Sequence, residues 1–341
     1  MQVLRALRRR PVISFTTTAV IGGTSYAYYV EHNANTNRSA VGGTIPREYN
    51  RDAIAEYWKQ RPISIISRVA TIGYEFIPIL SNYAIDFKIR DNLQDDLRQE
   101  KYLSHATKLR QALTTLGPAF IKFGQQLSIR PDLLPDTVLK ELQKLCDSVE
   151  PIPDAIAMQT IQEELGQETL DQYLLHPTKK MELVAAASLG QVYKATLKSG
   201  EMIAIKVQRP DMVEKVSLDL FLLNQYGLLL DTVFGVLTQQ IPFHAEFIDC
   251  FAKASFEELD YEKEAANQVF FKQEFKKRKC QVYIPQVYQE LTTRRVICTE
   301  WIDGVKLADA DQETIRRLIP VGVELFMTQL LDIGAFHADP Q

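Results

Sequence analysis

Apolar residues recur at helical spacing through most of the first half of the chain. This spacing predicts a pair of helices between Asp52 and Asp95, followed by single helices that end near Leu116, Leu145 and Leu165. A glycine followed by a proline, at positions 117 and 118, predicts the end of one helix and the start of the next, because proline suits the first helical turn.

The first helix pair has an apolar and aromatic middle that runs from Ile63 to Phe87. Three charged residues, Arg68, Glu75 and Asp86, interrupt it. The interruptions favour amphipathic helices of a soluble protein, able to lie on a membrane surface, over a transmembrane span.

The pattern changes to short apolar runs separated by turns between Leu183 and Gln208. It predicts three strands, with a corner of small residues at 185–190 and a turn at 198–200. Lys206 lies inside the third apolar run. Burying its charge there without a partner would cost roughly several kcal/mol of desolvation free energy. The segment is therefore either a surface hairpin whose lysine escapes at an edge, or a cradle in which small residues let backbone amides approach a phosphate.

The second half of the chain returns to helix after this hairpin. We expect a long helical tract from Val213 to about Lys279, strands at 282–284 and 295–300, and a turn at 301–304. A largely apolar helical stretch from Thr314 to Ala335 follows, with a kink or restart at Pro320.

Composition and charge exclude several classes of protein. The apolar share of 46% and the charged share of 24% are ordinary for a globular protein, and the net charge of −4 gives no case for nucleic-acid binding. Four cysteines lie far apart with no CxxC motif, which indicates a reducing compartment. The five histidines show no ligand spacing, so no metal site made of protein ligands alone is visible.

Residues 1–30 differ from the rest of the chain. Arginines at positions 5, 8, 9 and 10 precede the first acidic residue, Glu31, and the stretch 11–30 is uncharged and rich in hydroxyl groups. This composition is typical of an organelle transit peptide. A membrane anchor or signal segment and an ordinary N-terminus are the alternatives. The polar stretch 32–46 reads as a linker.

Two polar clusters admit both a functional and an ordinary interpretation. Lys122 lies three residues before Gln125 on one helix face, with Gly124 between them, where the glycine suggests close approach of another backbone. Glu258 and Asp260 lie about 200° apart on a helix, so both meet one ligand only if one of them sits at an irregular helix start. Taken alone, each cluster is more simply explained as part of a solvated surface.

Taken in order, these segments resemble the UbiB-like atypical kinases, a protein-kinase-like family tied to coenzyme Q and other prenylquinones. The resemblance covers roughly residues 95–341. The matching motifs are the KxGQ helix (Lys122, Gly124, Gln125), the alanine-rich loop (Ala185, Ala186, Ala187, Ser188, Gly190, Gln191), the strand lysine (Lys206), the ExD motif (Glu258, Asp260), the helix glutamate (Glu264), the hinge (Glu300, Ile302) and the catalytic-loop aspartate (Asp339).

The resemblance implies an α+β, protein-kinase-like fold that binds ATP or ADP with magnesium. Its domains would be a targeting segment and linker at 1–46, a helical extension at 47–178, a small lobe at 179–303 and the start of a large lobe at 304–341. Lys206 would hold the phosphates and Glu264 would orient it. Backbone groups of Glu300 and Ile302 would meet the adenine. Lys122 and Gln125 would cover the cleft and meet the ExD carboxylates, where other kinases dock a protein substrate.

The chain ends two residues after Asp339, which departs from the family pattern. The asparagine and the DFG aspartate that hold magnesium in the family have no counterpart among the 341 residues. We therefore expect a truncated chain with unknown metal ligands and no turnover of its own, or else a naturally shortened pseudokinase.

The function implied by the resemblance is that of an atypical kinase or ATPase supporting prenylquinone or lipid metabolism in an organelle. The segment 49–62 resembles the plastid and cyanobacterial branch, which favours a plastid over a mitochondrion. The expected partners are nucleotide, a membrane surface, isoprenoid or quinone lipids and the enzymes that make them. A non-catalytic nucleotide or lipid binder and a helical scaffold without ligand are the alternatives.

Overall fold

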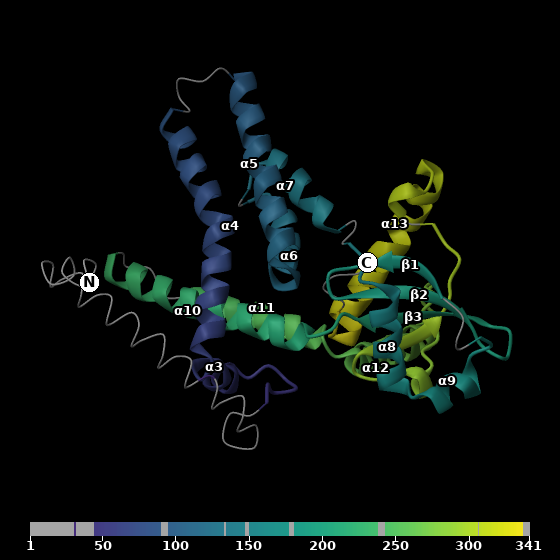
Figure 1. Cartoon of the computed structure of the whole chain (residues 1–341). Helices are drawn as coiled ribbons and strands as arrows, with labels where there is room; N and C mark the ends of the chain where they lie inside the picture. Colours follow the sequence, from purple (N-terminus) through teal and green to yellow (C-terminus); the bar gives the residue numbers. More distant parts are fainter. Residues whose placement is uncertain are drawn as a thin grey trace, which may run out of the picture. The chain divides into compact units, whose positions relative to one another are not determined.

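The computed structural model describes residues 31, 44–89, 95–132, 134–146, 150–176, 181–237, 243–305 and 307–336. The chain folds into two compact units, each built from two stretches of sequence (Figure 1). We call residues 1–149 with 211–257 the helical unit, and residues 150–210 with 258–341 the sheet unit. The expected transit peptide lies outside the described residues, and the domain boundaries expected from the sequence remain predictions.

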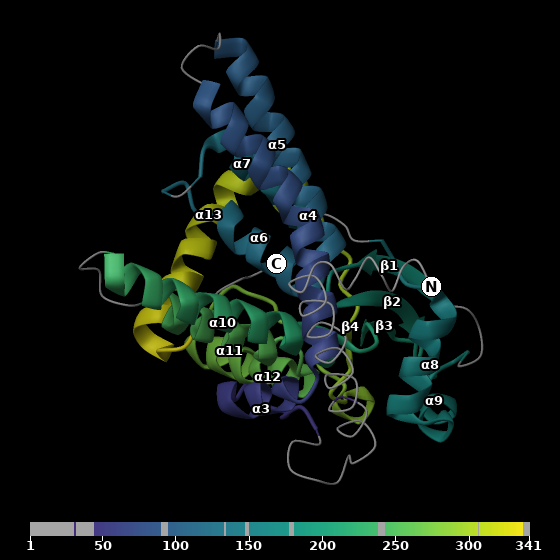
Figure 2. The same ribbon diagram turned by 60° about the vertical axis from the view of Figure 1, so that its left-hand side comes forward.

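The helical unit is built from long helices, of which α4 and α5 run side by side (Figure 2). Leu113, Phe120 and Leu142 contribute to a buried cluster that joins α5, α6 and α7. The predicted junction at 117–118 is confirmed, since Gly117 caps α6 and Pro118 is its first residue. The helices are α3 (Arg51–Lys59), α4 (Pro62–Ile89), α5 (Asp95–Leu116), α6 (Pro118–Ser128), α7 (Asp136–Gln143), η2 (Lys144–Cys146), α10 (Met212–Leu237) and α11 (His244–Glu257).

The sheet unit contains a four-stranded antiparallel sheet in the order β1-β2-β3-β4. Its central strand β3 is paired along its length with β2 on one side and with β4 on the other, so that Lys206 lies between Val192 and Ile297. The predicted turn at 198–200 joins β2 to β3. The strands are β1 (Glu182–Ala186), β2 (Gly190–Thr196), β3 (Met202–Gln208) and β4 (Val296–Glu300).

Side chains of β3 alternate between the two faces of the sheet, as the period of a strand requires. Ile203, Ile205 and Val207 are buried in one cluster with residues of α8 (Asp154–Leu165) and α9 (Gln167–Tyr173). Lys206 and Gln208 point the other way, toward α12 (Tyr261–Arg278) and the segment that precedes it. One face of β3 therefore makes core, and the other carries polar groups.

The secondary structure differs from the expectation in three details. Residues 282–284 form no strand, and pairing with β4 starts only after Pro285, where Gln286, Val287 and Tyr288 meet β4. Proline has no N–H to donate to a ladder. The tract expected at 213–279 is helical and consists of α10, α11 and α12. The separation between α11 and α12 lies at 258–260. The short helix α9 was not predicted.

Helix α13 (Gln312–Met327) continues through Pro320 instead of restarting there, and a π-helix (Thr328–Ile333) follows it. No residue of α13 is buried. The expected apolar face is present and exposed, with Leu318, Ile319, Val323 and Phe326 among its side chains. Short 3-10 turns lie at Gln289–Leu291 and Leu307–Asp309.

A buried ion pair joins two helices of the helical unit. Arg68 of α4 donates from Nε to Oδ1 of Asp219 at 2.6 Å, and from Nη2 to Oδ2 at 2.8 Å. The Asp219 side chain is 1% exposed, and its burial raises the pKa of the carboxyl despite the guanidinium beside it. The charge that interrupts the apolar middle of α4 is thus bonded to a partner on α10.

The two helices joined by this pair are also the most apolar long helices among the described residues. The segments Pro62–Asp86 and Met212–Leu237 are long and apolar enough to cross a membrane by length and composition alone. Their mean hydropathies over 18 residues are 1.4 and 1.5.

Replacing Arg68 with methionine should destabilise the helical unit by about 3–5 kcal/mol at neutral pH, because it leaves a buried carboxylate without a partner. Urea unfolding measures the loss. The loss should shrink as the pH falls toward the raised pKa of Asp219, since protonation removes the unpaired charge.

Removing both charges, with Arg68→Met and Asp219→Leu together, should restore most of the stability. Arg130→Ala is the matched control, because the pair of Arg130 with Asp132 is exposed and screened by water. Equal losses for Arg68→Met and Arg130→Ala would contradict the prediction.

Candidate functional site

The pair of Lys206 with Glu264 is the centre of the candidate site. The ammonium of Lys206 on β3 donates to both carboxylate oxygens of Glu264 on α12, at 2.8 and 2.7 Å. The two side chains are 34% and 39% exposed, so the pair is accessible from solvent. The contact between these two residues that the sequence resemblance implied is present within the sheet unit.

The start of α12 places Glu264 on the side of Lys206. Asp260 is the N-cap of α12, with an extended backbone (φ −116°), and its carboxylate accepts from the N–H groups of Glu262 and Lys263. Asp260 thus lies at an irregular helix start, which is the condition that the spacing of the ExD motif sets for both carboxylates to meet one ligand.

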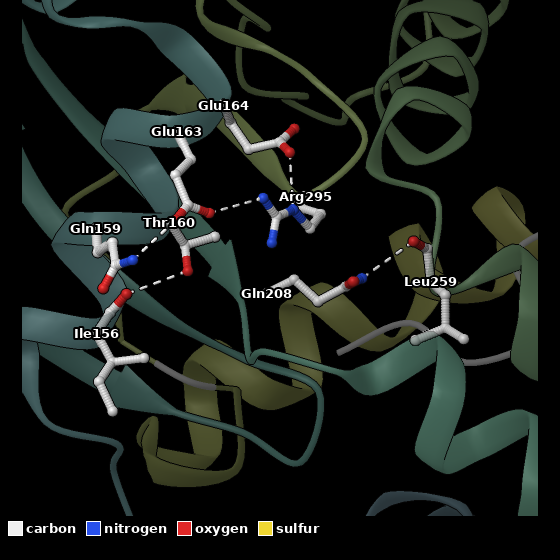
Figure 3. A network of polar contacts seen from close by, with 8 residues as sticks. All are labelled: Ile156, Gln159, Thr160, Glu163, Glu164, Gln208, Leu259 and Arg295. Atoms are coloured by element: carbon white, nitrogen blue, oxygen red, sulfur yellow. Dashed lines mark hydrogen bonds and ion pairs between the residues drawn. The ribbon is translucent and has the colours of Figure 1, made fainter. Parts of the chain in front are cut away.

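A second polar side chain of β3 holds the ExD segment to the sheet. Gln208, only 1% exposed, donates to the carbonyl oxygen of Leu259 at 3.0 Å (Figure 3). Sequence reasoning missed this residue. The available signal was its position two residues after Lys206, which puts both side chains on one face of the strand.

The alanine-rich loop is a tight turn between β1 and β2, closed by Arg209. The N–H of Ala187 donates to the carbonyl of Gly190 at 2.8 Å. Arg209 donates from its backbone N–H to Leu189 and from Nε to Ala187, at 2.9 and 3.0 Å. Burial lowers the pKa of Arg209. No local pattern in the sequence indicates this role for Arg209.

The predicted loop residues have different surroundings. Ala185 and Ala186 belong to β1 and pair with Val192 and Gln191, while Ser188 lies in the turn. Gln191 is completely buried, accepts from the N–H of Ile152 and donates to its carbonyl. Its side chain therefore holds the segment before α8 to the sheet.

Gly190 is required by close packing at the end of this loop. A Cβ atom at this position would lie 2.5 Å from the carbonyl oxygen of Val207 and 2.7 Å from the hydroxyl oxygen of Tyr261. The strand β3 and the first residue of α12 thus leave no space for a side chain.

An ion-pair network holds α8 against the loop that precedes β4. Arg295 donates to Glu164 at 2.7 Å and to Glu163 at 3.2 Å (Figure 3). Within α8, Thr160 donates to the carbonyl of Ile156, and Gln159 to Glu163. The network braces the face of the sheet opposite Lys206.

The two predicted hinge residues lie at the end of β4: Glu300 is its last residue and Ile302 follows it. Glu300 accepts from the hydroxyl of Tyr283 at 2.6 Å, a hydrogen bond that lowers the pKa of the Glu300 carboxyl. Its backbone N–H donates to Gln286. Ile302 lies beyond the strand and is 45% exposed.

The KxGQ residues lie on α6, in the helical unit. Gln125 donates to the carbonyl of Leu145 at 3.0 Å. A Cβ atom on Gly124 would lie 2.5 and 2.8 Å from side-chain carbons of Leu145 and Leu113. The expected approach of another backbone at Gly124 was therefore wrong, since leucine side chains fill the space.

The expected contact between Lys122 and the ExD carboxylates stays a prediction, because Lys122 belongs to the helical unit and Glu258 to the sheet unit. Asp339 lies outside the described residues, so its role also stays a prediction.

A four-stranded antiparallel sheet with a strand lysine paired to a helix glutamate defines a protein-kinase-like small lobe. Residues 144–341 match the model of the ABC1 atypical kinase-like domain. The chain therefore belongs to the ABC1 atypical kinase family, and its α+β fold is kinase-like.

Relatives of this chain occur in plants and bacteria. It is 35% identical over 308 residues to "Protein ACTIVITY OF BC1 COMPLEX KINASE 3, chloroplastic" of Arabidopsis thaliana, covering 88% of this chain and 42% of the relative. It is 37% identical over 299 residues to an uncharacterized protein of Synechocystis, and the match covers 86% of this chain and 42% of that protein. It is 37% identical over 247 residues to "Probable protein kinase UbiB" of Pseudomonas aeruginosa, covering 71% and 45%.

The chain spans less than half the length of these relatives. A solved structure of a Mycobacterium tuberculosis protein in complex with erythromycin is 27% identical, covers 63% of this chain and 52% of its own, and has a TM-score of 0.39. The chloroplastic and cyanobacterial relatives fit a plastid protein.

Replacing Gly190 with alanine should destabilise the sheet unit by about 1–3 kcal/mol, because the added methyl group meets a backbone carbonyl that cannot turn away. Thermal unfolding measures the change. Gly322→Ala, on α13 with no atom within 4 Å, is the matched control and should cost nothing. An unfolding temperature for Gly190→Ala equal to that of the parent would refute the packing argument.

Proposed function

We propose that the protein containing this chain binds ATP or ADP at the sheet unit and acts as an atypical kinase or ATPase. The observation that carries this proposal is the accessible pair of Lys206 and Glu264 on the polar face of β3. In this proposal the ammonium of Lys206 contacts the nucleotide phosphates, and Glu264 keeps it in place. The small residues 185–188 let the loop backbone approach the same phosphates.

The hinge completes the proposed nucleotide site. Backbone groups of Glu300 and Ile302 would contact the adenine, since the side chain of Glu300 is bonded to Tyr283 and Gln286. Asp339 would be the catalytic aspartate. Lys122 and Gln125 would cover the cleft and regulate access.

Magnesium is implied by kinase chemistry, but the described residues do not fit a magnesium site. No group of three or more histidine, cysteine, aspartate or glutamate residues that could hold a metal ion is found in that part of the chain. Glu264 is bonded to Lys206 and Asp260 caps α12. We therefore assign the phosphate contact to Lys206 and name no magnesium ligand among the described residues.

A non-catalytic nucleotide sensor is the second candidate function, because the accessible Lys206–Glu264 pair could hold phosphates without any transfer step. Magnesium-dependent release of phosphate from ATP by the longest natural form separates the two. Turnover that disappears with Asp339→Ala supports the enzyme, and binding without turnover supports the sensor.

The biological setting that we propose is prenylquinone or lipid metabolism in a plastid, at a membrane surface. Chloroplastic and cyanobacterial relatives support the compartment. The apolar helices α4 and α10 support contact with a membrane. Isoprenoid or quinone lipids, and the enzymes that make them, are the proposed partners.

Replacing Lys206 with alanine should weaken nucleotide binding about 10- to 100-fold, because it removes a charge-assisted contact to phosphate. Isothermal titration with ADP and ATP measures the affinities. Lys198→Ala, in the turn between β2 and β3, is the matched control and should leave them unchanged. If Lys206→Ala bound both nucleotides as tightly as the parent, the phosphate contact would be wrongly assigned.

Replacing Ala186 with glycine should change the ratio of the ADP and ATP affinities, because glycine widens the range of backbone conformations open to the loop. The same titrations measure the ratio. Ala195→Gly makes the same change elsewhere in the sheet, opposite Ile203, and should leave the ratio unaltered. If the parent, Ala186→Gly and Ala195→Gly had the same ratio of ADP and ATP affinities, the alanine-rich loop would have no part in nucleotide preference.

A further inference from the structure

Tyr261 is a buried residue whose ring lies beside the candidate site, and it belongs to none of the motifs of that site. Its side chain is 0% exposed and packs with Ala265, Val287 and Ile297. Its backbone N–H donates to the carbonyl of Arg294 at 3.1 Å. The ring is therefore fixed between α12 and β4 before any ligand arrives.

The ring of Tyr261 lies against the ammonium of Lys206. Nζ of Lys206 is 4.5 Å from the ring centroid, within the range over which the electron-rich face of an aromatic ring attracts a cation. The same ammonium is 2.7 Å from the carboxylate of Glu264. Two different groups thus hold one charge.

Both groups come from the first turn of α12. Tyr261 and Glu264 are three residues apart, so they share one face of the helix. The cap at Asp260 fixes where that turn begins. A single helix end therefore presents an aromatic ring and a carboxylate to the strand lysine.

The hydroxyl group of Tyr261 does not explain why the residue is there. It is buried and has no hydrogen-bond partner among the described residues. Burial, followed by the charges of Glu264 and Glu258, raises the pKa of this hydroxyl, which therefore stays neutral. Its oxygen lies beside Gly190, where it takes space that a Cβ atom would need. The contact that remains is that of the ring with Lys206.

We propose that Tyr261 is a positioning residue for Lys206, whose ammonium is held between the Tyr261 ring and the Glu264 carboxylate. The consequence for the nucleotide rests on the proposed function. The ring gives the ammonium a second contact, which keeps it in place while phosphate competes with Glu264 for it.

The test replaces residue 261 in the full 341-residue chain with phenylalanine and with phenylalanines that carry one, two or three ring fluorines. Fluorination keeps the shape of the ring and withdraws electron density from its face. Acetylation of individual lysines by sulfosuccinimidyl acetate, followed by mass spectrometry, measures how firmly each ammonium is held. Lys194, which lies 4.5 Å from the ring of Trp301, is the internal control.

We expect the acetylation rate of Lys206 to be kept in Tyr261→Phe and to rise about two- to fivefold across the fluorinated series. The rate of Lys194 should not change. Tyr261→Leu, which removes the ring, gives a second measure and should raise the Lys206 rate at least as much. If the acetylation rate of Lys206 did not change with the number of ring fluorines, the proposal would be wrong, and the ring would serve only to fill space in the core.

Titration of the same variants with ADP separates this proposal from the function on which it rests. A Lys206 rate that follows fluorination in a protein that binds no nucleotide would support the positioning role and refute the proposed function. Nucleotide binding that persists, with neither affinity nor Lys206 rate responding to the series, would refute the positioning role alone.

Discussion

A charged lysine on an otherwise apolar strand is the constraint that organises the sheet unit. Lys206 is only one-third exposed on β3, and Glu264 is the anionic neighbour that its ammonium bonds. This contact fixes where α12 begins and which of its faces points toward the sheet. The cap at Asp260 and the packing of Tyr261 then follow from the same placement.

The end of β3 connects three parts of the candidate site. Lys206 bonds to α12, Gln208 bonds to the segment before it, and Arg209 closes the alanine-rich loop. These residues are adjacent or nearly adjacent in sequence, so a shift of β3 by one position would disturb all three contacts together. The side chains of Lys206 and Gln208 project from one face of β3, while its apolar side chains form core on the other face.

The sequence predicted local features well where a few neighbouring residues determine them. The junction at Gly117 and Pro118 follows from proline geometry, and the strand before Trp301 follows from apolar spacing. The strand expected at 282–284 failed because pairing begins only after Pro285.

Contacts between distant residues could not be predicted in the same way. The side chains of Gln208, Arg209 and Tyr261 contact residues 51, 22 and 55 positions away, at Leu259, Ala187 and Lys206, and local patterns do not contain this information. Gly124 shows the same limit, since its position in a helix revealed a tight space but not that leucine side chains fill it. The pairing of Lys206 with Glu264 was expected only because the motifs resemble a known family.

The salt bridge between Arg68 and Asp219 also restricts how the apolar helices can meet lipid. If α4 and α10 entered a bilayer as separate spans, each would carry an ionised group into hydrocarbon without its counter-charge, which is unfavourable by several kcal/mol, roughly. Joined, they turn these groups toward each other and leave Ile66, Tyr74, Ile77 and Leu80 on the outer surface of α4. In the proposed setting at a membrane surface, this pairing would keep both ionised groups within the helical unit and leave the exposed apolar side chains of α4 to contact lipid.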